Sequence, residues 1–308
     1  MKWIFCAFGA LLFWGCAGTL SQTQGGVSEK NSHFFWKVSD DNSHVWVLGS
    51  IHFADSSFYP LDSIIENAFD SSQELAVEID VSNDSVANEV GKESMEQGLL
   101  KAGMTLNQVL PADLWNSLDS LCNSWNVPVA GLMNLKPWLA AMSLSVLALQ
   151  RTGVDPSYGI DAVLLNRANE EGKTVVGLET ANQQVRALSG GNDSDSAGIY
   201  YLRSTLREIS DLDSMVVRMK RAWKTGDDDL LRLVMNEEGP TSGSEEKIKK
   251  KMDEDIYENR NVKMAENIKE FLKDDRSIFV VVGAAHLVLD DNNVMELLKK
   301  QGFKVERF

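Results

Sequence analysis

Two of the four histidines in the chain follow a glycine at the same spacing, as Gly49-Ser-Ile-His52 and Gly283-Ala-Ala-His286. With 22 glycines and 4 histidines in 308 residues, chance predicts about 0.3 such matches. Each motif directly follows a strongly apolar run that is typical of a strand. Ligands in open α/β sheets bind beyond the carboxyl ends of strands, and glycine allows the chain to turn there. Either histidine alone also fits a turn, but the pair favours one shared site.

Carboxylates end two further strand-like runs. Glu78 and Asp80 alternate with apolar residues, so both are expected on one face of a strand. Glu179 follows a short apolar run, and an acid at the end of a buried strand is costly unless it is paired or bound to metal. The alternative for Glu179 is a first-turn acid of the helix that begins beside Thr180. The sequence therefore predicts Glu78 in the histidine pocket, with Asp80 beside it or one layer behind.

Arg260 lies on an apolar helical stripe, four residues from both Ile256 and Met264. An inward-facing arginine requires a partner, because an unpaired buried charge is very costly. Two partners fit this position, a structural carboxylate or a group in the histidine pocket. In the second case the guanidinium would hold a substrate carboxylate or a developing oxyanion.

The elements that must position these side chains are strands at both ends of the chain with helices between them. This order predicts a mixed central α/β sheet, flanked by helices and carrying a helical insertion. Expected strands cover residues 34–38, 44–49, 74–80, 173–178, 276–283 and 302–308, and expected helical regions cover residues 60–69, 86–150, 157–171, 197–273 and 294–300. The first two strands are expected to form a hairpin.

The bulk composition excludes several classes of protein. The net charge is −15 and the pI is near 4.7, which disfavours nucleic acid as a partner. Only Cys122 lies beyond the N-terminal apolar segment, so we expect neither an internal disulfide nor a thiolate zinc site, and a buried thiol at that position. Dinucleotide, P-loop, zincin and serine-hydrolase signatures are absent from the sequence.

The N-terminus predicts export. One lysine precedes a short apolar run that ends at Gly15-Cys16, and a run of this length is typical of a signal peptide. The small residue before Cys16 resembles a bacterial lipoprotein processing site. We therefore expect a signal peptide over residues 1–16, lipid on Cys16, a flexible tether over 17–32 and one domain over 33–308. The predicted location is the cell envelope, at the outer membrane or cell surface; a plain secretory signal is the alternative.

These residues together resemble the TraB/GumN family, which includes the eukaryotic Tiki proteins. The likeness rests on the order and spacing of many short motifs. They are Leu48-Gly-Ser-Ile-His52, Val77-Glu-Ile-Asp80, Leu135-Lys-Pro-Trp138, Gly159-Ile-Asp161, Gly177-Leu-Glu-Thr180 with Gln183, Trp223-Lys-Thr-Gly-Asp227, Arg260-Asn261 with Met264-Ala265, and Val282-Gly-Ala-Ala-His-Leu287. One departure is Leu289, which stands where family members commonly carry a glycine.

The resemblance implies a fold akin to the haem-associated ChaN and erythromycin-esterase-like proteins. It also implies a site of two histidines with a glutamate and an arginine. Tiki proteins are regarded as divalent-metal-dependent peptidases, so the resemblance favours a metal-dependent hydrolase acting on a peptide or protein.

In this hypothesis His52, Glu78 and His286 hold Mn²⁺, Co²⁺ or Zn²⁺, and the open coordination position takes a water. Glu179 is an extra ligand or a general base, and Arg260 stabilises the oxyanion. Two alternatives remain open. One is a surface protein that binds a peptide, haem or metal without turnover; the other is a metal-free hydrolase that uses a histidine as base. The substrate, the metal and the oligomeric state are not predicted.

Overall fold

The protein is built on one six-stranded mixed sheet. A computed structural model describes residues 33–191, 195–237, 243–273 and 276–308. The strand order is β4-β3-β5-β2-β1-β6. The strands are β1 (Phe35–Ser39), β2 (His44–Ser50), β3 (Glu74–Val77), β4 (Thr174–Gly177), β5 (Ile278–Gly283) and β6 (Lys304–Arg307).

Four neighbouring strands, β4, β3, β5 and β2, run parallel. Their carboxyl ends therefore meet at one edge of the sheet, where Ser50 pairs with Gly283 and Val77 with Gly177. The hairpin of β1 with β2 and the edge strand β6 complete the sheet in antiparallel pairing. Both the hairpin and the last edge strand agree with the sequence prediction.

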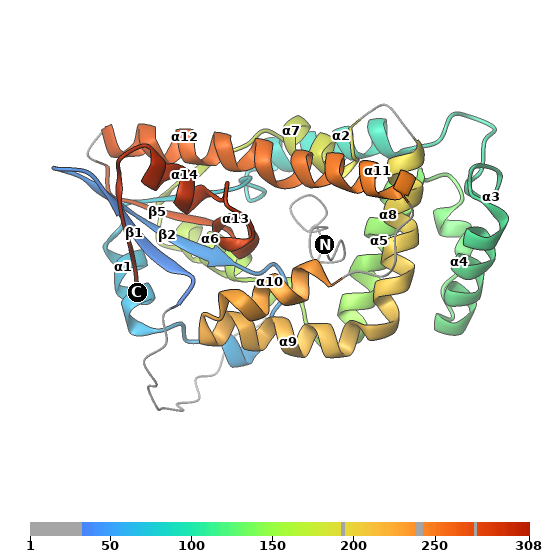
Figure 1. Cartoon of the computed structure of the whole chain (residues 1–308), viewed down its shortest axis with the longest axis horizontal. Helices are drawn as coiled ribbons and strands as arrows, with labels where there is room; N and C mark the ends of the chain where they lie inside the picture. The colour runs from blue at the N-terminus through green and yellow to red at the C-terminus, as the bar shows by residue number, and fades with distance from the viewer. Residues whose placement is uncertain (1–32, 192–194, 238–242, 274–275) are drawn as a thin grey trace.

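Helices surround the sheet and extend away from it (Figure 1). Helix α6 packs against β3 and β4, α12 lies against β2 and α14, and α10 packs on α9. In Figure 1 α11 and α12 run along the top, α9 and α10 along the bottom, and α5 and α8 on the right. The helices are α1 (Ser63–Ser71), α2 (Asp84–Gly98), α3 (Leu106–Val109), α4 (Ala112–Trp125), α5 (Pro137–Arg151), α6 (Ile160–Glu170), α7 (Ala181–Leu188), α8 (Asp195–Glu208), α9 (Leu212–Thr225), α10 (Asp228–Asn236), α11 (Gly243–Asp253), α12 (Asn259–Lys273), α13 (Ala284–Val288) and α14 (Val294–Lys300).

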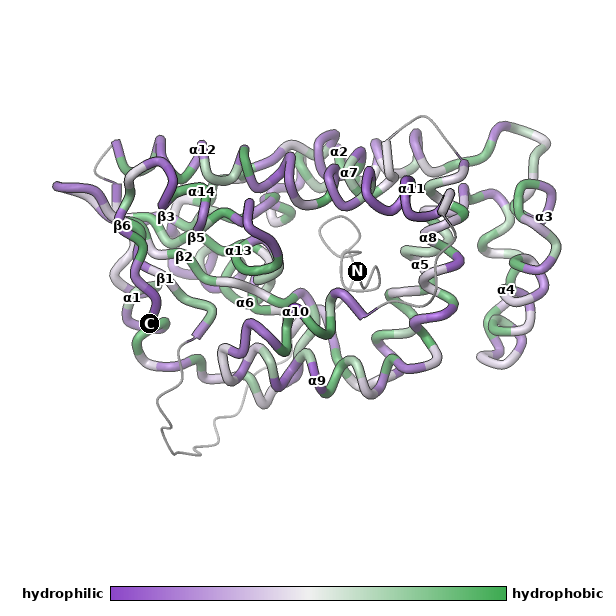
Figure 2. The backbone as a smooth tube through the Cα atoms, viewed as in Figure 1, coloured by the Kyte–Doolittle hydropathy of each residue, from purple (hydrophilic) through white to green (hydrophobic). Residues whose placement is uncertain are grey.

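Burial explains the arrangement of strands and helices. The apolar residues of β5 are fully covered, with at most 1% of each exposed, as a strand with helices on both faces requires. Figure 2 shows the central strands coloured largely hydrophobic and α11 mostly hydrophilic. The predicted α/β class is therefore confirmed, and Cys122 is buried and free as expected.

The N-terminal predictions concern a part of the chain that the structure does not describe. The predicted signal peptide, Cys16 and the tether all lie outside the described residues. Within the part of the chain that is described, no helix combines the length and apolarity needed to cross a membrane.

Candidate functional site

The carboxyl edge of the parallel strands carries a pocket of about 70 Å³. His52 follows β2, Glu78 follows β3, and His286 lies in the short helix after β5. Arg260, near the start of α12, completes the charged and titratable part of the lining. The two histidines, far apart in sequence, thus reach one pocket because β2 and β5 are adjacent parallel strands.

Gly283 is the point at which three of these side chains converge. A Cβ atom placed on it would lie 3.3 Å from Glu78 Oε1, 3.6 Å from His286 Cδ2 and 4.0 Å from His52 Nε2. Its N–H donates to Glu78 Oε1 at 2.7 Å, and the same oxygen lies 3.9 Å from His286 Nε2. The second Gly-x-x-His glycine thus anchors the glutamate as well as allowing the turn.

Arg260 joins two buried carboxylates. Its Nε donates to Glu179 Oε1 at 2.8 Å, and its Nη2 donates to Glu179 Oε2 at 2.7 Å and to Glu78 Oε2 at 2.5 Å. Nη1 donates to the Ile256 carbonyl at 3.3 Å. A guanidinium has five N–H donors, so one Nη1 N–H has no partner within the described residues. The two sequence alternatives for Arg260 therefore coincide, because its structural partner Glu78 also lines the histidine pocket.

The charges in this network are strongly coupled. Burial would raise the pKa of Glu78, but the charges of Arg260, His286 and His52, together with the hydrogen bond from the Gly283 N–H, outweigh burial and lower the pKa to about 2. Burial would likewise lower the pKa of Arg260, but Glu179 and Glu78 raise it. Glu78 and Arg260 are therefore both charged at neutral pH.

His286 is held neutral and in one tautomer. Burial and then the Arg260 charge lower its pKa to about 3. Its Nδ1 lies 2.7 Å from Asn261 Oδ1, while Asn261 Nδ2 donates to the Asn292 carbonyl. Since the amide oxygen can only accept, the histidine proton lies on Nδ1. The lone pair is then on Nε2, the nitrogen nearer Glu78.

His52 is oriented by the segment that begins α6. Its Nδ1 lies 3.1 Å from Asp161 Oδ2. Burial would lower the pKa of His52, but the Asp161 carboxylate and the charge of Glu78 together outweigh burial and raise the pKa to about 9. A Cβ on Gly159 would lie only 2.5 Å from the His52 carbonyl oxygen, so a glycine is required for this close approach.

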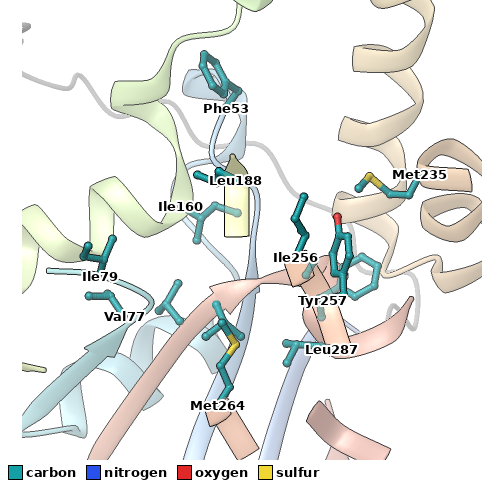
Figure 3. Packing of buried hydrophobic residues seen from close by; sticks show 14 of the residues in the cluster. Phe53, Val77, Ile79, Ile160, Leu188, Met235, Ile256, Tyr257, Met264 and Leu287 are labelled. Carbon is teal, nitrogen blue, oxygen red and sulfur yellow. The ribbon is translucent and has the colours of Figure 1, made fainter. Parts of the chain in front are cut away.

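An apolar wall covers the remaining side of the pocket. A single π-helical turn, Glu254–Glu258, leads into α12 and buries Ile256 and Tyr257. π-Helical turns inside α-helices are frequent at functional sites. The Tyr257 ring packs on the His286 ring with centroids 5.2 Å apart. Figure 3 shows Ile256 and Tyr257 beside Leu287, below Leu188.

The chain is similar to known proteins of one family. A family model described as the TraB/PrgY/gumN family matches residues 34–307. The chain belongs to this family. The resemblance drawn from the sequence motifs is thus confirmed, whereas the likeness to ChaN remains a prediction. No solved structure matches the chain.

Relatives in the TraB/PrgY/gumN family carry names that state no activity. "Uncharacterized protein YbaP" of Escherichia coli (strain K12) is 27% identical over 52% of this chain and 58% of its own length, and its Shigella flexneri counterpart has the same identity and coverage. An "Uncharacterized protein" of Treponema pallidum (strain Nichols) is 23% identical over 75% of this chain and 70% of its own length. The matched regions thus span less than two thirds of the YbaP proteins.

Asp80 does not line the pocket itself; its Oδ1 accepts hydrogen bonds from the backbone and hydroxyl of Ser82. Its place one layer behind Glu78 stays a prediction. The alternation that placed Asp80 beside Glu78 applies only within a strand, and β3 ends at Val77. Glu78 itself lies in the pocket as expected.

Other polar residues of the site were not predicted. Asp161 and Asn261 orient the two histidines, and Gln184 lines the pocket. Asp161 and Asn261 belong to the motifs Gly159-Ile-Asp161 and Arg260-Asn261, so the signal was present in the sequence without a role attached to it. The partners of these residues lie far away in sequence, which is why no local pattern assigned them.

The donor types at the pocket fit a divalent cation. Two imidazole Nε2 atoms and a carboxylate are ligands that Zn²⁺, Mn²⁺ and Co²⁺ accept. Both oxygens of Glu78 are engaged, by Arg260 and by the Gly283 N–H. Among the described residues, no three His, Cys, Asp or Glu side chains form a ready cluster of metal-ligand spacing. A bound ion would therefore require Glu78 to share an oxygen between the ion and its present partner.

Proposed function

We propose that the chain is a divalent-metal-dependent hydrolase acting on peptides, with His52, Glu78 and His286 as metal ligands. One observation carries the proposal. Each histidine has its Nδ1 next to a side-chain oxygen, of Asp161 or Asn261. This leaves the Nε2 of His286 3.9 Å from Glu78 Oε1, and the Nε2 of His52 4.0 Å from a Cβ placed on Gly283. Carboxylate or carbonyl partners of this kind orient metal-ligating histidines in many proteins.

The bound ion would supply an activated water at neutral pH. The residues of the chain do the rest. Glu78 provides the negative charge that a cation requires, and Arg260 keeps that carboxylate ionised. The remaining Nη1 N–H of Arg260 is available to a developing oxyanion. Glu179, with both oxygens bonded to Arg260, holds the guanidinium in place; a role as an extra ligand would require it to leave that pair.

The test measures metal content and turnover together. Protein purified without added metal is analysed for Mn, Co and Zn beside His52→Ala and a control, His44→Ala, whose histidine is exposed at the start of β2. We expect about one ion per chain in the wild type and the control, and loss of the ion in His52→Ala. Peptide-library turnover should stop with EDTA and return when Mn²⁺, Co²⁺ or Zn²⁺ is added.

A second candidate is a metal-free hydrolase, supported by the opposite pKa shifts of the two histidines. The pKa of His52 is raised to about 9 and that of His286 is lowered to about 3. Paired groups whose pKa values are pushed apart often divide acid and base roles. Turnover that survives EDTA in ion-free protein would support this candidate. Peptide binding without turnover would instead support the surface binding protein.

A further inference from the structure

Gln184 is a buried amide in the pocket whose oxygen has no hydrogen-bond partner among the described residues. It lies in the middle of α7, five residues after Glu179, and only 1% of it is exposed. Its Oε1 accepts no hydrogen bond from any described residue. Ser50 Oγ, 2% exposed and lining the same pocket, is in the same state. Leaving a buried polar group without a hydrogen bond is costly, so a molecule that enters the pocket and bonds to these two groups would be stabilised there.

The surroundings of Gln184 restrict what that ligand can be. Leu188, Met219, Leu231, Met235 and Ile256 line the pocket from α7, α9, α10 and the π-helical turn. Figure 3 shows Leu188, Met235 and Ile256 approaching from these separate elements. The charged lining comes from the histidine, glutamate and arginine network alone. A charged ligand group would lose its water against the aliphatic wall without gaining a partner, whereas a thioether and aliphatic surface adapts to varied apolar side chains.

We propose that Gln184 is a substrate-positioning residue whose Oε1 accepts a hydrogen bond from a backbone N–H of a peptide. The neighbouring apolar side chain of this peptide lies against the aliphatic wall. The inference rests on the proposed hydrolytic function and names its substrate class. A peptide group supplies the N–H donor that Oε1 requires, and an apolar side chain buries the aliphatic wall. Gln184 contacts the substrate and leaves the chemistry to the histidine network.

The stability of the empty protein separates this role from a structural one. Replacing an unsatisfied buried amide by an apolar group of similar shape is nearly neutral or stabilising. Gln184→Leu and Gln184→Met should therefore melt at or above the wild-type temperature while peptide binding weakens. The matched control is Gln97→Leu, which should leave binding unchanged. It removes another amide outside the pocket whose buried Oε1 has no partner in the described part of the chain. Early melting of both Gln184 variants would show a structural role and overturn the proposal.

A double-mutant cycle tests the hydrogen bond itself: Gln184 is replaced in the protein, and the backbone N–H is removed from the peptide. The probes are acetylated, amidated alanine hexapeptides with one central Leu, Asp, Lys or N-methyl-leucine, and binding is measured by calorimetry. We expect the Leu peptide to bind wild type at least tenfold more tightly than the Asp and Lys peptides. N-methylation should cost about tenfold in wild type and nothing further in Gln184→Leu.

Equal N-methylation penalties in the two proteins, or no preference for Leu, would overturn the proposal. Because the measurement is of binding, it is independent of turnover. If N-methylation weakens binding in wild type and not in Gln184→Leu, but no peptide is cleaved, the hydrolase is contradicted and this binding site stands. If peptides are cleaved but N-methylation weakens binding equally in wild type and Gln184→Leu, only the role of Gln184 is contradicted.

Discussion

At the residue scale, the buried guanidinium of Arg260 is shared by two carboxylates, those of Glu78 and Glu179. Arg260 forms ion pairs with Glu78 and Glu179, so this buried trio carries one uncompensated negative charge. The excess lies beside His52 and the neutral His286. A divalent cation or a protonated imidazole is the natural counter-charge, and the raised pKa of His52 is consistent with that demand.

Arg260→Lys should lower stability as well as activity. Removing one partner of a buried ion pair costs about 3–5 kcal/mol, and a lysine ammonium cannot reproduce the planar fork that bridges two carboxylates. We expect the free energy of unfolding in urea to fall by roughly 2 kcal/mol or more. Arg186→Lys is the control, since Arg186 is exposed and pairs with no described side chain. Unchanged stability in Arg260→Lys would contradict the bridging role.

Asn261→Ala should release His286. Without the amide oxygen the imidazole loses the contact that fixes its tautomer, and losses of this kind cost about 10- to 100-fold in metal affinity. Competition with a chelator measures the effect. Asn267→Ala is the control, because Asn267 lies on the same helix and donates to the Leu178 carbonyl instead. If both variants bind metal like the wild type, the orienting role assigned to Asn261 is wrong.

At the scale of elements, α9 fastens the loop that carries His52. Trp223 Nε1 donates to the Gly49 carbonyl at 2.7 Å, and Lys224 Nζ donates to the Ser57 carbonyl at 2.8 Å. Lys220 forms a short ion pair with Asp55. A helix outside the sheet thus holds the first Gly-x-x-His turn at both of its ends.

The Lys220–Asp55 pair should give stability a dependence on acid pH. Burial would raise the pKa of Asp55, but the hydrogen bonds from Lys220 and Ser57 and the charge of Lys220 together outweigh burial and lower the pKa to about 2. A depressed pKa stabilises the fold above the ordinary value of 3.8 and loses that contribution as pH falls towards 2. The stability gap between wild type and Lys220→Met should therefore be constant above about pH 5 and close below pH 4. Urea unfolding across this range measures it, with Lys101→Met as the exposed control; a gap that persists at pH 2 would argue against the pair.

Gly159→Ala should disturb His52 from behind. The added methyl would lie 2.5 Å from the His52 carbonyl oxygen and 2.9 Å from its carbon, and neither backbone atom can rotate away. Overpacking of this kind costs about 1–3 kcal/mol. We expect earlier thermal unfolding and a lower metal content than in Gly131→Ala, where the new methyl meets nothing within 4 Å. Equal behaviour of the two variants would refute the contact.

The sequence predicted the elements better than the contacts between them. Apolar runs located β2 and β5, and the matched motifs indicated that His52 and His286 meet. Local patterns could not predict where β3 ends, so the alternation that put Asp80 on the same face as Glu78 does not hold beyond Val77. The same limit applies to Asp161 and Gln184, whose positions depend on how α6 and α7 pack against strands far away in the chain. Periodicity reports which face of an element is buried and does not report what lies opposite that face.

At the scale of the whole molecule, the predicted lipid anchor remains to be tested. We expect Cys16→Ser to move the protein from the membrane fraction to the soluble fraction, because a single apolar signal run gives no lasting attachment once it is cleaved. Ser21→Ala, in the predicted tether, should leave the distribution unchanged. Attachment that survives in Cys16→Ser would mean that the signal was misinterpreted.

The sheet order also has a consequence for biosynthesis. Strand β2 ends at Ser50, yet its parallel neighbour β5 begins only at Ile278. A ribosome adding about 5–20 residues per second therefore completes the first histidine motif many seconds before its pairing partner exists. During that interval β2 has an open edge, which is a template for wrong strand pairing. The nascent chain must be kept from associating with other chains until β5 has emerged, and the histidine pocket cannot form before His286 has been synthesised.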